Sequence, residues 1–253
     1  VELDTLKSRI KVTPAVALDW EAASVSVPDS EWEIANRRPT VTVPGKFKPG
    51  TQYTIEIAAG VGDFFKQSAA DGLKATLQTA DLSPALVSGG SLGVIEKGDA
   101  APVVPIEVSN LKTLNTRLWK LSVPELAKVL GDRGNDVAKL ARAPDFSEDE
   151  KLSYPRNVAR VHPVKLAKVL GEGAKTGVAL VSVTSPELEY RPAEGYQQLV
   201  QVTDLAAHIK VGPKSSLAWV TRLSDGKPVA DADVSIFDSL GAQLWAGKTN
   251  ADG

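Results

Sequence analysis

Residues 199–253 consist of short segments in which apolar and polar residues alternate, and this pattern limits the region to β-structure. A period of two residues is typical of strands, which place successive side chains on opposite faces of a sheet. We expect three strands here: 217–223, 233–238 and 243–249. Asp225 and Gly226, followed by Lys and Pro, predict a tight turn, because glycine adopts positive φ and proline fixes φ.

The sequence ends on another turn, Asn250-Ala-Asp-Gly253, with no strand-forming segment after it. A hairpin turn needs a second strand, so we expect the last β-domain, residues 195–253, to be truncated. The missing strand would leave an exposed edge, where another segment or chain could pair. We therefore interpret the chain as part of a longer protein.

The first 82 residues have the spacing of strands and turns that is typical of a small β-sandwich. Pro49-Gly-Thr-Gln-Tyr53, followed by Ile55 and Ile57, resembles the bacterial immunoglobulin-like pattern in which Pro-Gly-Thr-x-Tyr begins a strand. We expect strands over 9–13, 24–27, 40–43, 52–58 and 74–79. The pattern predicts a fold and no particular function.

A second β-sandwich is expected over 91–194, after a Pro- and Gly-containing linker over 81–90. Its strands are expected over 92–96, 103–108, 116–121 and 176–184. Ser122 and Glu125 have the spacing of a capping box and predict a helix that ends at Gly131. The hexapeptide of that helix, Leu-Ala-Lys-Val-Leu-Gly, recurs at 166–171, which predicts a second short helix. The acidic, Pro-containing segment 142–155 is expected to be an exposed loop.

Composition excludes several classes of protein. Among 253 residues, Lys and Arg number 29 against 31 Asp and Glu, so the chain lacks the concentrated positive charge that nucleic acids and membrane surfaces attract. No apolar run reaches the roughly 20 residues of a spanning helix. The sequence starts at Val1 and contains no Met, so an export signal could have been removed. With no Cys, the chain cannot form a disulfide, a thiolate zinc site or a cysteine nucleophile.

No group of residues predicts catalysis or metal binding. His162 and His208 belong to no metal-binding motif, and we expect His162 at the start of a helix. The acids Asp145, Glu148, Asp149 and Glu150 lack the spacing of a calcium loop, so a solvated loop is the better interpretation. Asp252 is expected to be a turn residue. We therefore predict no catalytic residue, no cofactor site and no metal site.

The glycines and aromatic residues also have structural interpretations. Gly171 and Gly173 are followed by Thr176 where a dinucleotide-binding loop needs a third glycine, and Gly89-Gly90 lies in the linker. Serines form no Gly-x-Ser-x-Gly motif. The tryptophans are spread over all three expected domains, which favours core or interdomain packing over a ligand platform. They are Trp20, Trp32, Trp119, Trp219 and Trp245.

Several of these elements together resemble the bacterial alpha-2-macroglobulins. The strand Val200-Gln-Val-Thr-Asp-Leu205, the segment from Ala218 to Val234 and the final Thr249-Asn-Ala-Asp-Gly253 resemble the third macroglobulin-type domain of that family. The strand Asn115-Thr-Arg-Leu-Trp-Lys-Leu121, followed by a helix, resembles an element of the preceding domain. The resemblance covers the last quarter of the chain strongly and the middle more loosely.

The resemblance implies an all-β chain of tandem immunoglobulin- or fibronectin-like sandwiches, with a short helical insertion in the second. It implies a non-catalytic segment of an exported broad-spectrum endopeptidase inhibitor, periplasmic or on the cell surface, with target endopeptidases and neighbouring macroglobulin domains as partners. A membrane anchor would come only from an N-terminal lipid signal outside this chain. The family's Cys–Gln thioester cannot lie within it. A surface adhesin or scaffold of immunoglobulin-like repeats remains the alternative, and a carbohydrate-active enzyme with accessory sandwiches is a third.

Overall fold

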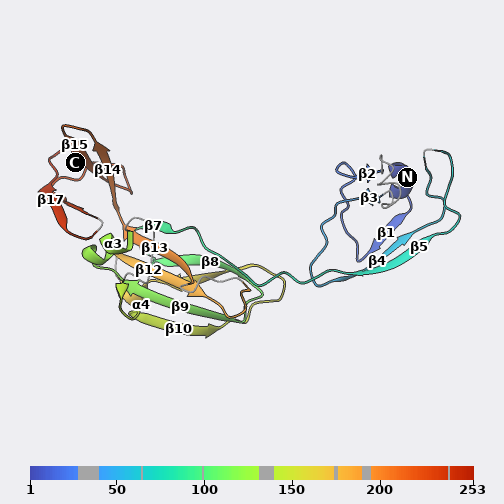
Figure 1. Cartoon of the computed structure of the whole chain (residues 1–253), viewed down its shortest axis with the longest axis horizontal. Helices are drawn as coiled ribbons and strands as arrows, with labels where there is room; N and C mark the ends of the chain where they lie inside the picture. The colour runs from blue at the N-terminus through green and yellow to red at the C-terminus, as the bar shows by residue number, and fades with distance from the viewer. Residues whose placement is uncertain are drawn as a thin grey trace. The chain divides into compact units, whose positions relative to one another are not determined.

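The computed structural model describes residues 1–27, 40–63, 65–98, 100–130, 140–173, 176–189, 195–238 and 240–253. The chain divides into two compact units, Val1–Leu82 and Ser83–Gly253, both built from β-sheets (Figure 1). The expected all-β class with few short helices is confirmed. Each unit is described by itself.

The first unit contains two small antiparallel sheets. Strands β1 (Ile10–Thr13), β4 (Gln52–Ile57) and β5 (Leu73–Gln78) form one sheet, and β2 (Ser24–Ser26) pairs with β3 (Thr40–Thr42). Helix α1 (Leu3–Lys7) precedes β1. These strands agree closely with the expected ones, because each keeps a two-residue period between turn residues.

Tyr53 anchors the core of the first unit. Its side chain is 2% exposed and meets the ring of Phe47 edge-on, with centroids 5.0 Å apart. The backbone N–H of Lys48 donates a hydrogen bond of 2.8 Å to the Tyr53 hydroxyl, so the buried phenol has a partner. Gly50 occupies the positive-φ turn position that the Pro-Gly-Thr-x-Tyr pattern predicts.

The second unit contains a sandwich of a five-stranded and a three-stranded sheet. The larger sheet has the order β10-β9-β12-β13-β7, and the smaller one β11-β8-β6. All pairs are antiparallel except β13 with β7. The strands of the larger sheet are β7 (Leu92–Glu96), β9 (Thr113–Lys120), β10 (Phe146–Lys151), β12 (Gly177–Thr184) and β13 (Tyr196–Thr203), and those of the smaller sheet are β6 (Ala85–Val87), β8 (Val103–Ser109) and β11 (Arg160–Lys165).

The main core lies between these two sheets. On β8, Val104, Ile106 and Val108 are all at most 3% exposed, whereas the residues between them face solvent. Leu114 and Leu118 of β9 are similarly buried opposite them. Burial of one such aliphatic side chain contributes about 1.5–3 kcal/mol, so this cluster dominates the stability of the sandwich.

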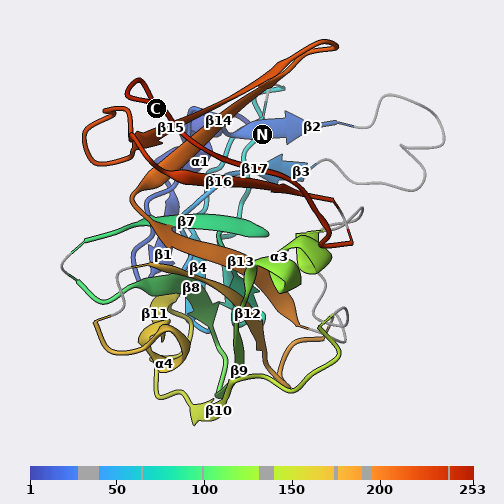
Figure 2. The same cartoon turned by 90° about the vertical axis from the view of Figure 1, so that its left-hand side faces the viewer.

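A helix covers the outer face of the larger sheet. Helix α3 (Val123–Leu130) lies beside this sheet (Figure 2). It buries Val129 completely, against Trp119, Leu180 and Leu199. At its start, the backbone N–H and the hydroxyl of Ser122 donate hydrogen bonds of 2.9 and 2.8 Å to the Glu125 carboxylate. The hydrogen bond that a capping box requires from the backbone N–H of its first residue, Ser122, to the side chain of Glu125 is therefore formed. The second helix, α4 (Ala167–Leu170), lies within the expected hexapeptide.

The last four strands form two hairpins, which we call the C-terminal hairpins. Strand β14 (Leu205–Val211) pairs with β15 (Ser216–Arg222), and β16 (Asp233–Phe237) pairs with β17 (Gln243–Lys248). Both predicted turns are present: Gly226 has φ +68°, and the Asn250 side chain accepts the N–H of Asp252 at 3.0 Å. Much of the apolar surface here is exposed, including Ile209 at 63% and Val211 at 81%.

Three expectations about segment boundaries are wrong. Segment 142–155 contains β10, which is hydrogen-bonded to β9, and linker 81–90 contains β6, which is hydrogen-bonded to β8. Residues 196–203 pair with both β12 and β7, so they belong to the sandwich and not to a last domain that starts at 195. Pairing with a distant partner, which local pattern does not reveal, decides all three.

Candidate functional site

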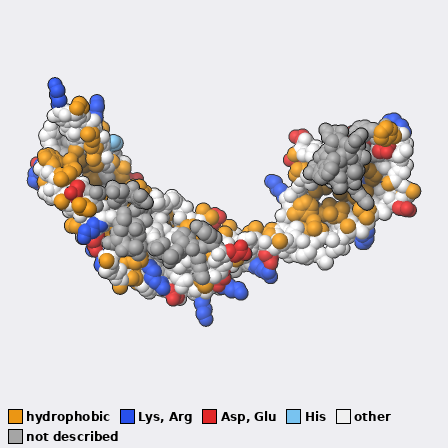
Figure 3. Space-filling view, viewed as in Figure 1, with side chains coloured by type: hydrophobic (Ala, Val, Ile, Leu, Met, Phe, Trp, Pro, Cys, Tyr) orange, Lys and Arg blue, Asp and Glu red, His pale blue; other side chains and the backbone are white. Residues whose placement is uncertain are grey.

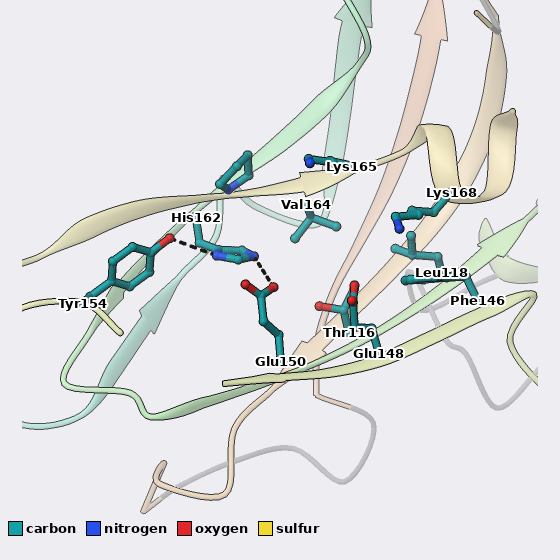
Figure 4. Close-up of a pocket in the computed structure, with 11 residues that line it drawn as sticks. Thr116, Leu118, Phe146, Glu148, Glu150, Tyr154, His162, Val164, Lys165 and Lys168 are labelled. Atoms are coloured by element: carbon teal, nitrogen blue, oxygen red, sulfur yellow. Dashed lines mark hydrogen bonds and ion pairs between the residues drawn. The ribbon is translucent and has the colours of Figure 1, made fainter. Parts of the chain in front are cut away.

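A cleft of about 380 Å³ opens at one side of the sandwich. It lies between β10 and β11, which are edge strands of the two different sheets. Side chains of both strands, of β9, of the segment before β11 and of α4 point toward it (Figure 4). Ligand sites are commonly concave and contain a few polar groups among apolar ones, and this cleft has that character.

His162 lies at one end of the cleft, between two polar partners. It is 8% exposed, with its Nδ1 atom 3.1 Å from the Tyr154 hydroxyl and its Nε2 atom 3.5 Å from a carboxylate oxygen of Glu150. The prediction that His162 starts a helix is wrong: it lies on β11, and α4 begins only at Ala167. Because both ring nitrogens face a partner, His162 orients Tyr154 and Glu150.

Charged side chains of both signs line the rest of the cleft. Glu148 and Glu150 share the inward face of β10, and Lys168 lies on α4. Lys165 ends β11 at the rim, with its side chain exposed on the face opposite His162 and Val164. The Lys168 ammonium lies 5.2 Å from the centre of the Phe146 ring. Among the described residues, no ion pair within 4.0 Å involves Glu148, Lys165 or Lys168. These side chains can therefore form ion pairs with charged groups of a ligand.

The arrangement offers little for metal binding. Within the described ranges, no group of three or more His, Asp or Glu side chains could hold a metal ion. The acidic segment instead forms an edge strand, in which Asp149 faces away from the cleft and pairs with Arg117 at 2.8 Å. Hydrogen bonds from Asn115 and Arg117 lower the pKa of Asp149. The prediction that these acids lie in a loop is wrong, because Glu148, Asp149 and Glu150 belong to strand β10.

The other residues considered from the sequence lie apart from the cleft. His208 packs on Trp219, with ring centroids 5.3 Å apart, and Asp252 lies in the final turn. Trp119 is a core residue at 4% exposure, Trp20 is half-buried, and Trp245 is 50% exposed. Trp32 lies outside the described residues.

An arginine binds α3 to the end of β9. Arg142 donates to Glu125 at 2.7 Å, to Asp145 at 2.9 Å and to the carbonyl of Lys120 at 2.9 Å. Hydrogen bonds from the Ser122 N–H, then from Arg142 and the Ser122 hydroxyl, lower the pKa of Glu125 to about 2. The same carboxylates raise the pKa of Arg142. This cluster stabilises the helical insertion, and sequence spacing indicated only its Ser122–Glu125 part.

A second cavity, of about 450 Å³, lies in the first unit and is almost entirely apolar (Figure 3). Its lining includes Leu6, Ile55, Ile57 and Phe47, and Asp71 is its one charged residue among those described. Polar groups that would orient a ligand are therefore few.

One family model matches the last part of the chain. Residues 202–253 match the model of the bacterial alpha-2-macroglobulin MG3 domain. A search of curated proteins found no match. No described helix has the length and hydropathy that crossing a membrane requires.

Solved structures share the fold over nearly the whole chain. The crystal structure of native alpha-2-macroglobulin from Escherichia coli spanning domains MG0-NIE-MG1 aligns with a TM-score of 0.58 at 14% identity, covering 98% of this chain and 78% of that one. The E. coli structure spanning NIE-MG1 aligns over 68% of this chain and 86% of that one, with a TM-score of 0.51 at 14% identity.

A much longer solved structure also shares the fold. The Salmonella alpha-2-macroglobulin mutant Y1175G aligns with a TM-score of 0.57 at 12% identity, over 98% of this chain and 14% of that one. At these identities the structures establish the fold alone, and the similarity by sequence is that of residues 202–253 to the MG3 domain. The chain therefore has the fold of the macroglobulin-type β-sandwich domains in these structures, and its residues 202–253 are similar in sequence to the MG3 domain of bacterial alpha-2-macroglobulins.

Proposed function

We propose that this chain is a structural, non-catalytic segment of an endopeptidase trap. The observation that carries the proposal is the MG3 match at residues 202–253. In the proposed mechanism, a protease cuts an exposed bait segment elsewhere in the full-length protein. The body then rearranges and encloses the protease, and this segment contributes part of the shell.

The surface of the C-terminal hairpins supports contacts with neighbouring domains. Ile209, Val211 and Leu244 are between 63% and 81% exposed, in a part of the chain where a folded domain would bury such side chains. Large exposed apolar patches commonly mark interaction sites, and interdomain contacts are one way to cover them. Neighbouring macroglobulin domains are the proposed partners, and target endopeptidases would act on the whole protein.

The sandwich of the second unit is also suited to move as a rigid body. Two packed sheets with a continuous aliphatic core resist deformation, so rearrangement is expected at connections between domains. The proposed location is outside the cytoplasm, in the periplasm or on the cell surface, where foreign endopeptidases are met.

The test uses the full-length gene product and a purified endopeptidase such as trypsin. After incubation, an enclosed protease should still cleave a small peptide substrate but lose most of its activity on a large protein substrate. The inhibitor should also change its migration on a native gel. A protease heat-inactivated beforehand is the control, because it cannot cut the bait.

Either of two results would contradict the proposal. One is full retention of activity on the protein substrate with an excess of inhibitor. The other is a native product, detected with an antibody against this segment, that is confined to the cytoplasm. A surface adhesin or scaffold would then be the better interpretation.

A further inference from the structure

Opposite charges line the cleft between β10 and β11 without neutralising one another. The carboxylates of Glu148 and Glu150 come from the β10 wall, and the ammonium group of Lys168 comes from α4 (Figure 4). Among the described residues, Glu150 faces His162 of β11 at 3.5 Å, whereas no ion pair within 4.0 Å involves Glu148 or Lys168. The space between them is the cavity of about 380 Å³.

Two of these groups are held in place by their surroundings. The carboxylate of Glu150 faces His162, which is almost fully buried and contacts Tyr154 through its other nitrogen. The Lys168 ammonium lies over the Phe146 ring, where the π-electrons attract a cation. A charged group that is already oriented loses less conformational freedom when a ligand binds.

Protection of an edge strand explains only part of this arrangement. Inward-pointing charges on an edge strand discourage other chains from pairing with it, and Glu148 and Glu150 can serve that purpose. Protection does not require a lysine, Lys168, across an open space from these carboxylates. A ligand with one positive and one negative group would satisfy both walls.

We propose that this cleft binds a small zwitterion with a free ammonium and a free carboxylate group, of the class of amino acids and short peptides with unblocked ends. The ammonium would lie against Glu148 and Glu150, and the carboxylate against Lys168. Phe146 and Tyr154 would contact the body of the ligand. The volume lies within the usual range of about 300–1,000 Å³ for small-ligand sites. The inference does not depend on protease trapping.

The test is a titration of the ¹⁵N-labelled 253-residue chain with alanyl-alanine, followed by amide chemical shifts. Saturable shifts are expected for amides of β10, β11 and α4. N-acetyl-alanyl-alanine and alanyl-alanine amide, which each lack one charge, should bind about fivefold more weakly, the size of one partly exposed ion pair.

Substitutions locate the site. Glu148→Gln and Lys168→Gln should each weaken binding by about fivefold. Both side chains are exposed, so the variants should fold, and the dispersion of their spectra checks this. Glu107→Gln and Lys151→Gln remove matched charges that do not line the cleft and should leave binding unchanged.

Three results would overturn the proposal. The first is the absence of saturable shifts in these elements up to about 10 mM ligand, well above an ordinary weak dissociation constant of about 1 mM. The second is equal binding of a blocked peptide, which would mean a simple anion or cation site. The third is an equal loss in the Glu107→Gln or Lys151→Gln control, which would mean unspecific attraction.

Discussion

The Asp204 carboxylate accepts two hydrogen bonds from Ser224, one from its backbone N–H at 3.0 Å and one from its hydroxyl at 3.1 Å. Asp204 is the single residue between β13 of the sandwich and β14 of the C-terminal hairpins. Its own carbonyl accepts the N–H of Leu223 at 2.7 Å, and the carbonyl of Thr203 accepts the N–H of Lys97 at 2.9 Å. The connection between β13 and β14 is therefore hydrogen-bonded both to residues 223–224 and to Lys97.

Asp204→Ala should loosen this connection. It removes two acceptors from Ser224, and each lost hydrogen bond to a charged group costs about 1.5–3 kcal/mol, less where water can replace it. Amide hydrogen exchange at Leu223 and Ser224 should become faster, by about tenfold or more. Asp204→Asn keeps an acceptor oxygen and should show a smaller effect. Unchanged exchange in the alanine variant would mean that the connection is held by other contacts.

Glu125→Gln should destabilise the helical insertion at neutral pH and much less in acid. The folded-state pKa of Glu125, about 2, lies below the ordinary value of 4.5, so its stabilising effect is complete above pH 4.5 and is lost toward pH 2. Urea unfolding of the parent chain and the variant should differ by about 1–2 kcal/mol near neutral pH and converge in acid.

A double-mutant cycle provides the control for Glu125. Arg142→Gln alone should destabilise the chain, and adding Glu125→Gln should cost less than it does in the parent, because the two side chains share hydrogen bonds. Additive losses, or a difference that persists undiminished near pH 2, would show that the ion pair contributes little.

Gly195→Ala should destabilise the start of β13 strongly. The residue has φ +76°, and an added Cβ would lie 2.8 Å from the carbonyl oxygen of Val183. Strain and crowding together should cost about 1–3 kcal/mol in thermal or urea unfolding. Gly226→Ala is the matched control, since φ is +68° and no atom lies within 4 Å of the added Cβ. An equal loss of unfolding free energy in both variants would mean that the positive φ alone, and not crowding of the added Cβ, causes the effect.

Strand β10 should resist proteolysis although its composition is that of a loop. A Glu-specific endopeptidase should cut the chain after Glu172, which lies in an exposed turn, before it cuts after Glu148 or Glu150. Cleavage within β10 requires this strand to leave β9, and such opening is rare in a packed sheet. Time-resolved mass spectrometry of the fragments measures the order. First cleavage within 146–151 would show that the edge strand opens readily.

The difference between predicted and observed strands follows from what each strand buries. β4 and β8 each place an apolar residue at every second position, so the period of two revealed them. β10 has the sequence Phe-Ser-Glu-Asp-Glu-Lys, with charges on both faces, and gives no such signal. It is a strand because β9 supplies hydrogen-bonding partners along its whole length.

The cleft could not be predicted from the sequence either, because its residues come from separate segments of the chain. Glu150, Tyr154 and His162 are separated by a turn and an irregular segment, and no motif joins them. The sequence predicts a helix that contains Lys168, but it does not predict that the Phe146 ring of another element lies beneath the Lys168 ammonium. An i, i+2 pair such as Glu148 and Glu150 would have been informative only if β10 had been recognised.

The sequence by itself determined the β class, the turns at Asp225-Gly226 and Asn250–Gly253, the start of α3 at Ser122 and the family resemblance. Each of these depends on residues close together in the chain, through φ preferences, period or a local hydrogen bond. Only the tertiary structure decided that β6 and β10 are strands, that residues 196–203 belong to the sandwich, and that His162 joins Glu150 to Tyr154. Those features arise from pairing between distant segments, whose energy depends on the partner and not on the local sequence.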